Sequence, residues 1–373
     1  GRLGMHVSID ARLVYYTRAG IAAYTLSLTD ALAAAFPEER FTLLQDARSR
    51  EPLINAPNVS IARTHVPSHH RAEQFLMPWV ARGIGADVFH SPDFIPPLRY
   101  RGRSVITIHD LAFLIYPHFM TRDAARYYGS IDRAVRHSDQ IIAVSQSTKR
   151  DLIRMLGTPE EKISVIYEAA DPLMGPVDRN EALQRVKALY DLPEEFILFV
   201  STIEPRKNVG GLLRAYSRLR QDYKLTPALV LVGAPGWLSD DVYALVDKLE
   251  IRPYTFFLGR VEASNLRYLY NAARCLVHPA FYEGFGLTPL EAMACGTPVI
   301  VSNISSLPEV VGDAGLLVDP QQDQEITVAL WRLLTDDALA AELRRKGLQR
   351  ASGFSWQRAA ELTMDVYRRA AYL

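Results

Sequence analysis

The sequence has few cysteines, no excess of charge of either sign and no long hydrophobic run. Its 373 residues include two cysteines, Cys275 and Cys295, without metal-ligand spacing, so neither a disulfide framework nor a structural zinc site is expected. Basic and acidic side chains number 42 each, which argues against a protein that binds nucleic acid. No apolar stretch reaches the length of a membrane span, and no basic segment followed by an apolar one opens the chain. A cytoplasmic protein is therefore the expectation.

Short β-branched runs alternate with longer amphipathic segments along almost the whole chain. Apolar strands that alternate with helices are typical of parallel sheets covered on both faces, so the fold class is α/β. The strands expected in the first half are His6–Asp10, Phe41–Gln45, Asp87–His90, Val105–His109, Gln140–Val144 and Ser164–Tyr167. Those expected in the second half are Phe196–Ser201, Ala228–Val232, Thr255–Leu258, Cys275–His278, Pro298–Val301 and Leu316–Val318. The helices expected between the strands of the first half include Ile21–Phe36, Asp123–His137 and Ser147–Leu156.

The alternation pauses at Asp171–Asn180, which holds two prolines, a glycine and no apolar period. A chain of this length suits two hydrophobic cores better than one. We predict one doubly wound domain over residues 1–172, a second over 173–354, and a last helix over 355–373 that packs back on the first domain. Ligands of such domains bind beyond the carboxyl ends of the strands, so the residues that follow each strand are the functional candidates.

The richest of these segments follows the strand Cys275–His278. Gly284 and Gly286 flank Phe285, so the backbone there can approach a ligand closely. A helix follows, and its unpaired first amides and its dipole favour an anion such as a diphosphate. Glu283 and Glu291 frame that position, and a carboxylate beside phosphate is better suited to accept hydrogen bonds from sugar or ribose hydroxyls. The carboxylate pair alone would more often be solvated, but the glycines and the helix start between them favour a ligand site.

Two further segments follow strands in the same way. Arg206 and Lys207, after the first strand of the second domain, are placed to neutralise charge on a leaving diphosphate, although a solvated pair is the ordinary alternative. Positive charge at a helix start is unfavourable, which favours a function for them. His109 ends an apolar strand of the first domain, where a lone histidine is more often structural. Gly20 opens the first helix and completes the candidates.

Together these residues resemble the signature of glycosyltransferase family 4, a large group of retaining enzymes. Glu283-Gly284-Phe285-Gly286-Leu287 with Glu291 carries the likeness, which extends from Met5 to the last helix. The flanking matches are Gly259-Arg260-Val261, Asn271-Ala272-Ala273 and Pro308-Glu309-Val310-Val311-Gly312. The resemblance implies a GT-B fold, in which two Rossmann-like domains face each other across a cleft. Residues 1–172 would bind the acceptor and residues 173–354 the nucleotide sugar.

The resemblance also implies roles for individual donor-site residues. Glu283 would contact hydroxyls of the transferred sugar, and Glu291 would bind the ribose. The segment at Val261 would lie along the nucleotide base and contact it largely through its backbone. The amides that would hold the sugar and the diphosphate are those of Phe285, Gly286, Leu287 and Thr288.

His109 would lie near the anomeric carbon and position the sugar, while the leaving phosphate helps to deprotonate the acceptor. Arg206 and Lys207 would neutralise the charge of the leaving diphosphate. The chain departs from the family at three places: many members have arginine at Ser201, a second glycine at Ala22 and Asn-Gly at Glu168-Ala169.

The branch written Glu-Pro-Arg-Lys-Asn includes many bacterial mannosyltransferases that build surface polysaccharides. We therefore expect transfer of a hexose from GDP-mannose, or next from UDP-glucose, to a hydroxyl of a saccharide or lipid-linked acceptor. No cofactor, essential metal or protein partner is expected. The alternatives are a sugar-nucleotide epimerase of the same shape, a glycogen phosphorylase relative, and a sugar-nucleotide-binding protein without turnover. A phosphorylase would need a lysine for pyridoxal phosphate, and the few lysines of the chain argue against it.

The apolar segment from Phe75 to Val80, between Arg71 and Arg82, has two interpretations. It is either a helix that lies at a membrane interface or a helix that packs its apolar side chains into the core. We expect core packing, and peripheral attachment to the inner face of a membrane stays as the alternative.

Overall fold

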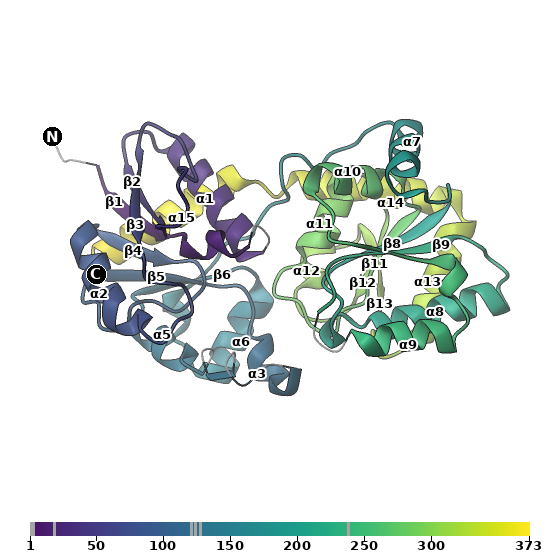
Figure 1. Cartoon of the computed structure of the whole chain (residues 1–373), viewed down its shortest axis with the longest axis horizontal. Helices are drawn as coiled ribbons and strands as arrows, with labels where there is room; N and C mark the ends of the chain where they lie inside the picture. The colour runs from purple at the N-terminus through teal and green to yellow at the C-terminus, as the bar shows by residue number, and fades with distance from the viewer. Residues whose placement is uncertain (1–3, 18–19, 120–121, 123–124, 127–128, 237–238) are drawn as a thin grey trace. The chain divides into compact units, whose positions relative to one another are not determined.

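The chain folds into two α/β units, which are described separately (Figure 1). The structure is a computed structural model that describes residues 4–17, 20–119, 122, 125–126, 129–236 and 239–373. The first unit comprises Gly1–Glu168 with Ser355–Leu373, and the second comprises Ala169–Phe354. The division follows Glu168 rather than residue 172, because the amide of Ile166 still donates to the carbonyl of Ala143 and Glu168 pairs with His109.

The first unit is built on a seven-stranded parallel sheet in the order β3-β2-β1-β4-β5-β6-β7. The strands are β1 His6–Asp10, β2 Arg40–Asp46, β3 Val59–Thr64, β4 Val88–Ser91, β5 Arg103–Ile108, β6 Gln140–Ala143 and β7 Ile163–Val165. Strand β3 was not expected from the sequence. It lies at the sheet edge, where only its last residue is buried, so it lacks the apolar run by which the inner strands are found.

Helices cover both faces of this sheet. Helices α1 and α15 pack on the face that carries Val7 and Ile9, and helices α2, α5 and α6 pack on the opposite face. Their bounds are α1 Ile21–Ala35, α2 Glu73–Ile84, α3 Ala112–Ile115, α5 Ile131–His137, α6 Gln146–Leu156 and α15 Trp356–Ala371. Part of the helix expected over 123–137 lies outside the described residues.

Helix α15, last in the chain, belongs to the core of the first unit. It begins at Ser355, whose hydroxyl accepts a hydrogen bond from the amide of Arg358 at 3.1 Å. The Tyr367 hydroxyl is 2.6 Å from Nδ1 of His90, and Nε2 of His90 is 2.7 Å from the Thr107 hydroxyl. The helix therefore completes a buried polar chain that starts in the sheet.

The second unit has a six-stranded parallel sheet in the order β10-β9-β8-β11-β12-β13. Its strands are β8 Phe196–Val200, β9 Ala228–Val232, β10 Thr255–Gly259, β11 Cys275–His278, β12 Val299–Ser302 and β13 Gly315–Val318. Helices α8, α9 and α13 pack on one face; α7 lies against α10, and α11 against α14. The helix bounds are α7 Arg179–Tyr190, α8 Val209–Asp222, α9 Asp240–Lys248, α10 Ala263–Ala272, α11 Leu287–Ala294, α12 Leu307–Val311, α13 Asp323–Thr335 and α14 Asp337–Ser352.

The expectation that the apolar residues of the 75–80 segment pack into the core is wrong for three of them. Met77 is buried, but Phe75, Leu76 and Trp79 are exposed on helix α2. The reason is that the helix touches the sheet through a narrow stripe, which Met77 and Ala81 fill. In the described residues, no helix combines the length and apolar character that a bilayer span requires.

Candidate active site

The loops after β8 and β11 are tied together where the strand order of the second sheet reverses. The amide of Phe281 donates to the carbonyl of Arg206 at 2.9 Å, and the Arg206 guanidinium donates to the carbonyl of Tyr282 at 3.1 Å. A second guanidinium nitrogen of Arg206 contacts Glu204 at 3.0 Å. Such a reversal leaves a crevice at the carboxyl ends of the strands, the usual ligand position of a doubly wound sheet.

Glu283 lies at the centre of this junction. Lys207 donates from Nζ to its Oε1 atom, and Nε2 of His278 donates to the same oxygen at 2.8 Å. The other oxygen, Oε2, has no hydrogen-bond partner within the described part of the chain. The backbone is fixed as well, because the amide of Glu283 donates to the Ser305 hydroxyl at 3.0 Å and the Ser306 hydroxyl donates to the carbonyl of Glu283 at 2.9 Å.

The charges around Glu283 keep it ionised. Burial would raise the pKa of its carboxyl, but Lys207, His278 and Arg206 outweigh burial and hold that pKa well below its ordinary range. Burial lowers the pKa of His278, and the nearby cations Lys207 and Arg206 lower it further against the pull of Glu283. His278 is therefore neutral and carries its proton on Nε2, facing the carboxylate.

Helix α11 begins directly beyond Glu283. Gly286 precedes it with φ of 112°, in the region where glycine is favoured, and a Cβ atom there would come within 3.0 Å of the Leu307 side chain. The carbonyl of Phe285 accepts from the Ser306 hydroxyl at 2.6 Å, which fixes the turn. The residue after Thr288 is proline, so the amides of Leu287 and Thr288 are the N–H groups that the first turn offers to an anion.

Glu291 sits in the second turn of α11 and faces α10. The Tyr270 hydroxyl donates to its Oε2 atom at 2.8 Å. Burial raises the pKa of Glu291 to about 7, with a smaller contribution from Asp171, while the hydrogen bond from Tyr270 lowers it. This carboxyl changes charge near neutral pH, unlike Glu283.

In the first unit, His109 follows β5 and lies between two acceptors. Its Nε2 atom donates to the carbonyl of Pro92 at 2.9 Å, and its Nδ1 atom is 3.1 Å from Oε1 of Glu168. Burial disfavours the charged ring, but the hydrogen bond and charge of Glu168 outweigh burial and raise the pKa of His109. The ring of Tyr24 meets it edge-on at 4.7 Å between centroids. Both ring nitrogens of His109 face acceptors, an arrangement that favours the charged ring and fixes its orientation.

Gly20 precedes α1 with φ of 59°, a left-handed value that favours glycine. The next departure from the family, Ala22, is fully buried in the core with α15, so its methyl group packs there. Val261 follows the edge strand β10. Strands β9 and β8 lie between β10 and β11, the strand that Glu283 follows. The structure thus gathers Arg206, Lys207, Glu283 and the start of α11, and leaves Val261 at the outer strand of the same sheet.

Known proteins agree with this architecture. The family description "Glycosyltransferase Family 4" matches residues 18–172, and "Glycosyl transferases group 1" matches residues 180–350. The O-antigen chain mannosyltransferase B of Escherichia coli is 32% identical over 382 residues, which cover 98% of this chain and 100% of that relative. The chain belongs to glycosyltransferase family 4.

Solved structures show the fold of this glycosyltransferase. Sucrose-phosphate synthase from Thermosynechococcus elongatus aligns with a TM-score of 0.80 at 23% identity and covers 98% of each chain. The Anabaena protein Alr3699/HepE, solved in complex with UDP and glucose, aligns with a TM-score of 0.74 at 17% identity, over 97% of this chain and 98% of that one. The two doubly wound units are therefore those of the GT-B fold.

Three residues contact the predicted site residues without having been predicted to do so from the sequence. His278 contacts Glu283, Tyr270 contacts Glu291, and Glu168 contacts His109. His278 had a usable signal, since it is a polar residue at the end of an apolar strand, beside the predicted loop. Glu168 also had a usable signal, because it is one of the positions where the chain departs from the family pattern described above. Tyr270 had none, because it lies on a different helix 21 positions before its partner.

In the described residues, no group of three or more histidine, cysteine, aspartate and glutamate side chains is arranged to hold a metal ion.

Proposed function

We propose that the chain is a retaining hexosyltransferase that moves mannose from GDP-mannose to a hydroxyl of a saccharide or lipid-linked acceptor in glycan synthesis. Membership of family 4 supports the reaction type, and the similarity to the E. coli mannosyltransferase supports mannose as the sugar. UDP-glucose is the second donor to test, in line with the UDP and glucose bound by the Anabaena protein. We further propose a location at the cytoplasmic face of a membrane.

The geometry of Glu283 is the observation that carries this proposal. An ionised carboxylate with one oxygen held by Lys207 and His278 keeps its second oxygen available for hydroxyl donors. Charge-assisted hydrogen bonds of this kind are stronger than neutral ones and have fixed geometry. We assign Oε2 of Glu283 to hydroxyls of the transferred sugar.

The leaving diphosphate is served by groups around the same carboxylate. The amides of Leu287 and Thr288 and the helix dipole of α11 favour negative charge, and Lys207 contacts Glu283, which stands just before the helix in the sequence. Groups that meet charge developing in the transition state lower the barrier more than they strengthen ground-state binding. Arg206 acts by positioning, because its guanidinium ties the two loops together.

Glu291 and His109 complete the assignment. Glu291 binds the ribose hydroxyls through its carboxylate, with Tyr270 holding it in place. The first unit binds the acceptor, and the ring of His109, fixed by Pro92 and Glu168, orients the donor sugar and polarises the site. Because Lys207 and the amides of α11 supply positive potential, we propose that transfer needs no metal, so a chelator should leave the rate unchanged.

Incubation with GDP-mannose and UDP-glucose in separate reactions tests the proposed function. We expect release of GDP from GDP-mannose with a kcat/KM at least about tenfold above that for UDP-glucose, a typical discrimination by direct binding. Proton NMR of the product should show the anomeric configuration of the donor. Tight nucleotide binding without release from any donor would overturn the proposal, and preference for UDP-glucose would overturn only the choice of sugar.

A further inference from the structure

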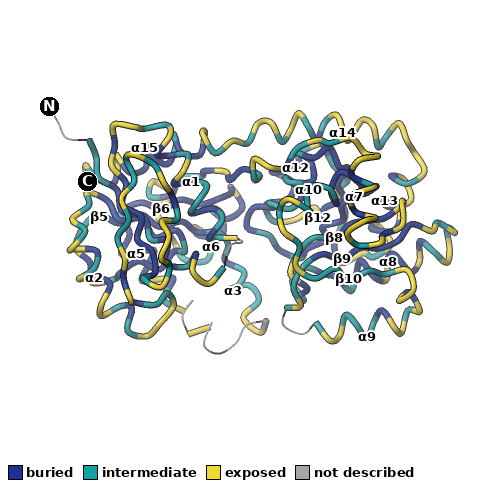
Figure 2. Tube along the Cα trace, turned by 45° about the horizontal axis from the view of Figure 1, so that its top comes forward, coloured by how far each residue is buried: buried dark blue, intermediate teal, exposed yellow. Residues whose placement is uncertain are grey.

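Helix α2 presents an apolar face that no described part of the chain covers. Phe75, Leu76 and Trp79 are 64%, 47% and 69% exposed, whereas Met77 and Ala81 on the other side of the helix are buried. At 3.6 residues per turn, positions 75, 76 and 79 project from one side. Figure 2 shows the helix alternating between exposed and buried segments. Three large apolar side chains on one exposed face mark an interaction surface rather than scattered exposure.

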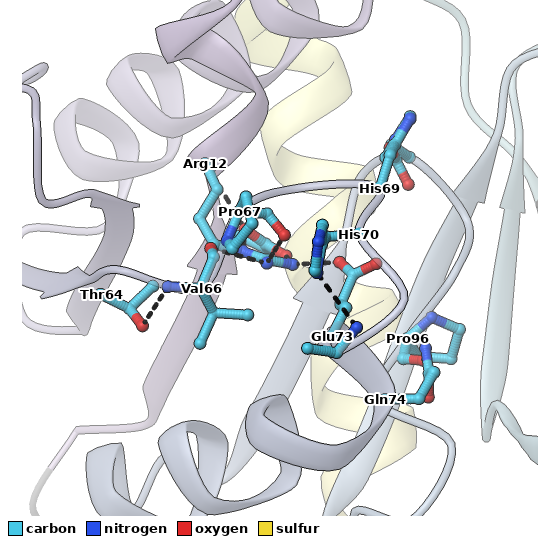
Figure 3. Close-up of polar contacts among 12 residues, drawn as sticks. Arg12, Thr64, Val66, Pro67, His69, His70, Glu73, Gln74 and Pro96 are labelled. Atoms are coloured by element: carbon cyan, nitrogen blue, oxygen red, sulfur yellow. Dashed lines mark hydrogen bonds and ion pairs between the residues drawn. The ribbon is translucent and has the colours of Figure 1, made fainter.

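The first turn of α2 is anchored to the end of β1. Arg12, only 2% exposed, donates from Nη2 to Glu73 in that turn at 2.5 Å and to Asp10 at 2.7 Å. Its Nη1 atom donates to the carbonyls of Val66 and Pro67, at 3.2 and 3.3 Å, in the loop that leads into the helix (Figure 3). The exposed face is therefore carried on a fixed support.

A second anchor joins α2 to the loop that follows β4. The Gln74 side chain donates to the carbonyl of Pro96 at 3.1 Å and accepts from the amide of Leu98 at 2.9 Å. The next residue of that loop, Arg99, lies over the ring of Phe75 at 5.3 Å from its centroid. The loop thus adds a cation to the edge of the apolar face.

The exposed charges around the face are mainly positive. Arg82 lies over the ring of Trp79 at 5.6 Å from its centroid, on the same helix. The nearby carboxylates Glu73 and Asp93 are engaged by Arg12 and His69, respectively. One exposed carboxylate, that of Asp87 beyond the helix, accepts a hydrogen bond from the amide of His6. The exposed arginines of α2 and its flanking loops are Arg71, Arg82, Arg99 and Arg101.

We propose that this face of α2 is a docking surface for an anionic phospholipid bilayer. An exposed Trp and Phe bordered by arginines match the chemistry of a membrane interface, where aromatic rings sit at headgroup level and basic side chains meet anionic lipid. The chain as a whole has no net charge, so this local excess of arginine is a property of the surface. Lipid binding by this face is independent of the donor assignment. Glu73 pairs with Arg12 just after the carboxyl end of β1, so bilayer binding would bring this edge of the first sheet near the lipid. That this proximity favours a lipid-linked acceptor rests on the proposed function.

Vesicle co-sedimentation with the full chain tests the proposal. Vesicles of phosphatidylcholine with about one third phosphatidylglycerol should bind the protein, and vesicles of phosphatidylcholine alone should bind it at least about tenfold more weakly. The double variant Phe75→Ser/Trp79→Ser should lose about tenfold or more in affinity for the anionic vesicles. The variant Arg82→Gln/Arg99→Gln should lose about fivefold for each arginine, with a weaker dependence on salt.

The matched control is Tyr254→Ser/Trp331→Ser, which removes two exposed aromatic residues of the second unit, one of them stacked under Arg220. This control should bind vesicles like the unaltered chain, and all variants should keep the same melting temperature and GDP affinity. Failure to bind anionic vesicles, or binding that Phe75→Ser/Trp79→Ser leaves unchanged, overturns the proposal. A concentration-dependent dimer that the same variant abolishes, without vesicle binding, would show that a second copy of the chain is the occupant.

Discussion

At the scale of single residues, the two glutamates of the proposed donor site differ in their pKa shifts. Glu283 is held ionised by neighbouring cations, whereas burial raises the pKa of Glu291 to about 7. An unfolded glutamate titrates near about 4.3, so Glu291 makes the folded state lose stability as pH rises from that value to about 7. A bound ribose would recover part of this loss, because its hydroxyls donate to the carboxylate.

We therefore predict that GDP affinity rises as pH increases through about 7 and levels off above it. In Tyr270→Phe the carboxylate loses its hydrogen bond, so the pKa of Glu291 rises and the increase in affinity shifts to higher pH. Calorimetric titration with GDP between about pH 6 and 9 measures the shift, with Glu291→Gln as the reference for titration of the nucleotide itself. An identical midpoint in Tyr270→Phe and the unaltered chain would refute the assignment of Glu291.

The pair of His109 and Glu168 gives a second prediction. Glu168→Gln removes the negative charge that raises the pKa of His109, so the pKa should fall, and burial should then favour the neutral ring. The ion pair stabilises the fold fully below the unfolded pKa of about 6.5 and loses this contribution as pH rises through the folded value. We expect kcat at about pH 7 to fall roughly tenfold while KM for the donor changes little. Histidine NMR titration checks the pKa, and an unchanged value would show that Glu168 does not set the charge of His109.

At the scale of secondary-structure elements, α15 is the clearest test of how the first unit is held together. Burial lowers the pKa of His90 to about 3, so its ring is neutral, with one nitrogen that donates and one that accepts, and the hydroxyls of Tyr367 and Thr107 are its two partners. Tyr367→Phe leaves a buried nitrogen unpaired and should lower the free energy of unfolding by about 1–3 kcal/mol. Met364→Ala should cost about 2–5 kcal/mol through the cavity it leaves in the core.

Urea unfolding of the full chain measures both changes in the transition of the first unit. Arg358→Ala, on the exposed side of the same helix, is the control and should stay within about 0.5 kcal/mol. If the two core substitutions were as mild as this control, the helix would contribute little to the stability of the first unit.

Elements that are buried on both faces could be predicted from the sequence, and those at an edge or surface could not. The six strands of the second unit were all anticipated, because each is an apolar run between a helix and a turn signal. Strand β3 was missed because it lies at the sheet edge with only its last residue buried, so it lacks the continuous apolar run of the inner strands. For α2, the amphipathic pattern was visible, but which of its two apolar sides meets the sheet depends on the tertiary contacts of Met77 and Ala81.

At the scale of the whole molecule, the strand order of the second sheet repeats that of the first apart from the additional β7, and the predicted site residues follow strands at or next to the reversal of each sheet. Each sheet reverses its order after its first strand, between β1 and β4 in one unit and between β8 and β11 in the other. Lys207 and Glu283 follow the two strands of the second reversal, and His109 follows the strand next to the first. The loops could be found from the sequence because strand ends mark them. Their partners could not, since hydrogen bonds across a junction leave no periodic signal.

The central claim is that Glu283 holds the transferred sugar, and Glu283→Gln tests it most directly. Glutamine keeps the shape and an acceptor for Lys207 but lacks the charge. We predict that release of GDP at saturating GDP-mannose falls by at least about 10²-fold. Calorimetry should show GDP affinity within about threefold of the unaltered chain, and Glu262→Gln, an exposed glutamate of the same unit, should behave like the unaltered enzyme. Turnover retained within a few fold, or an equal loss of turnover and GDP affinity, would contradict the account.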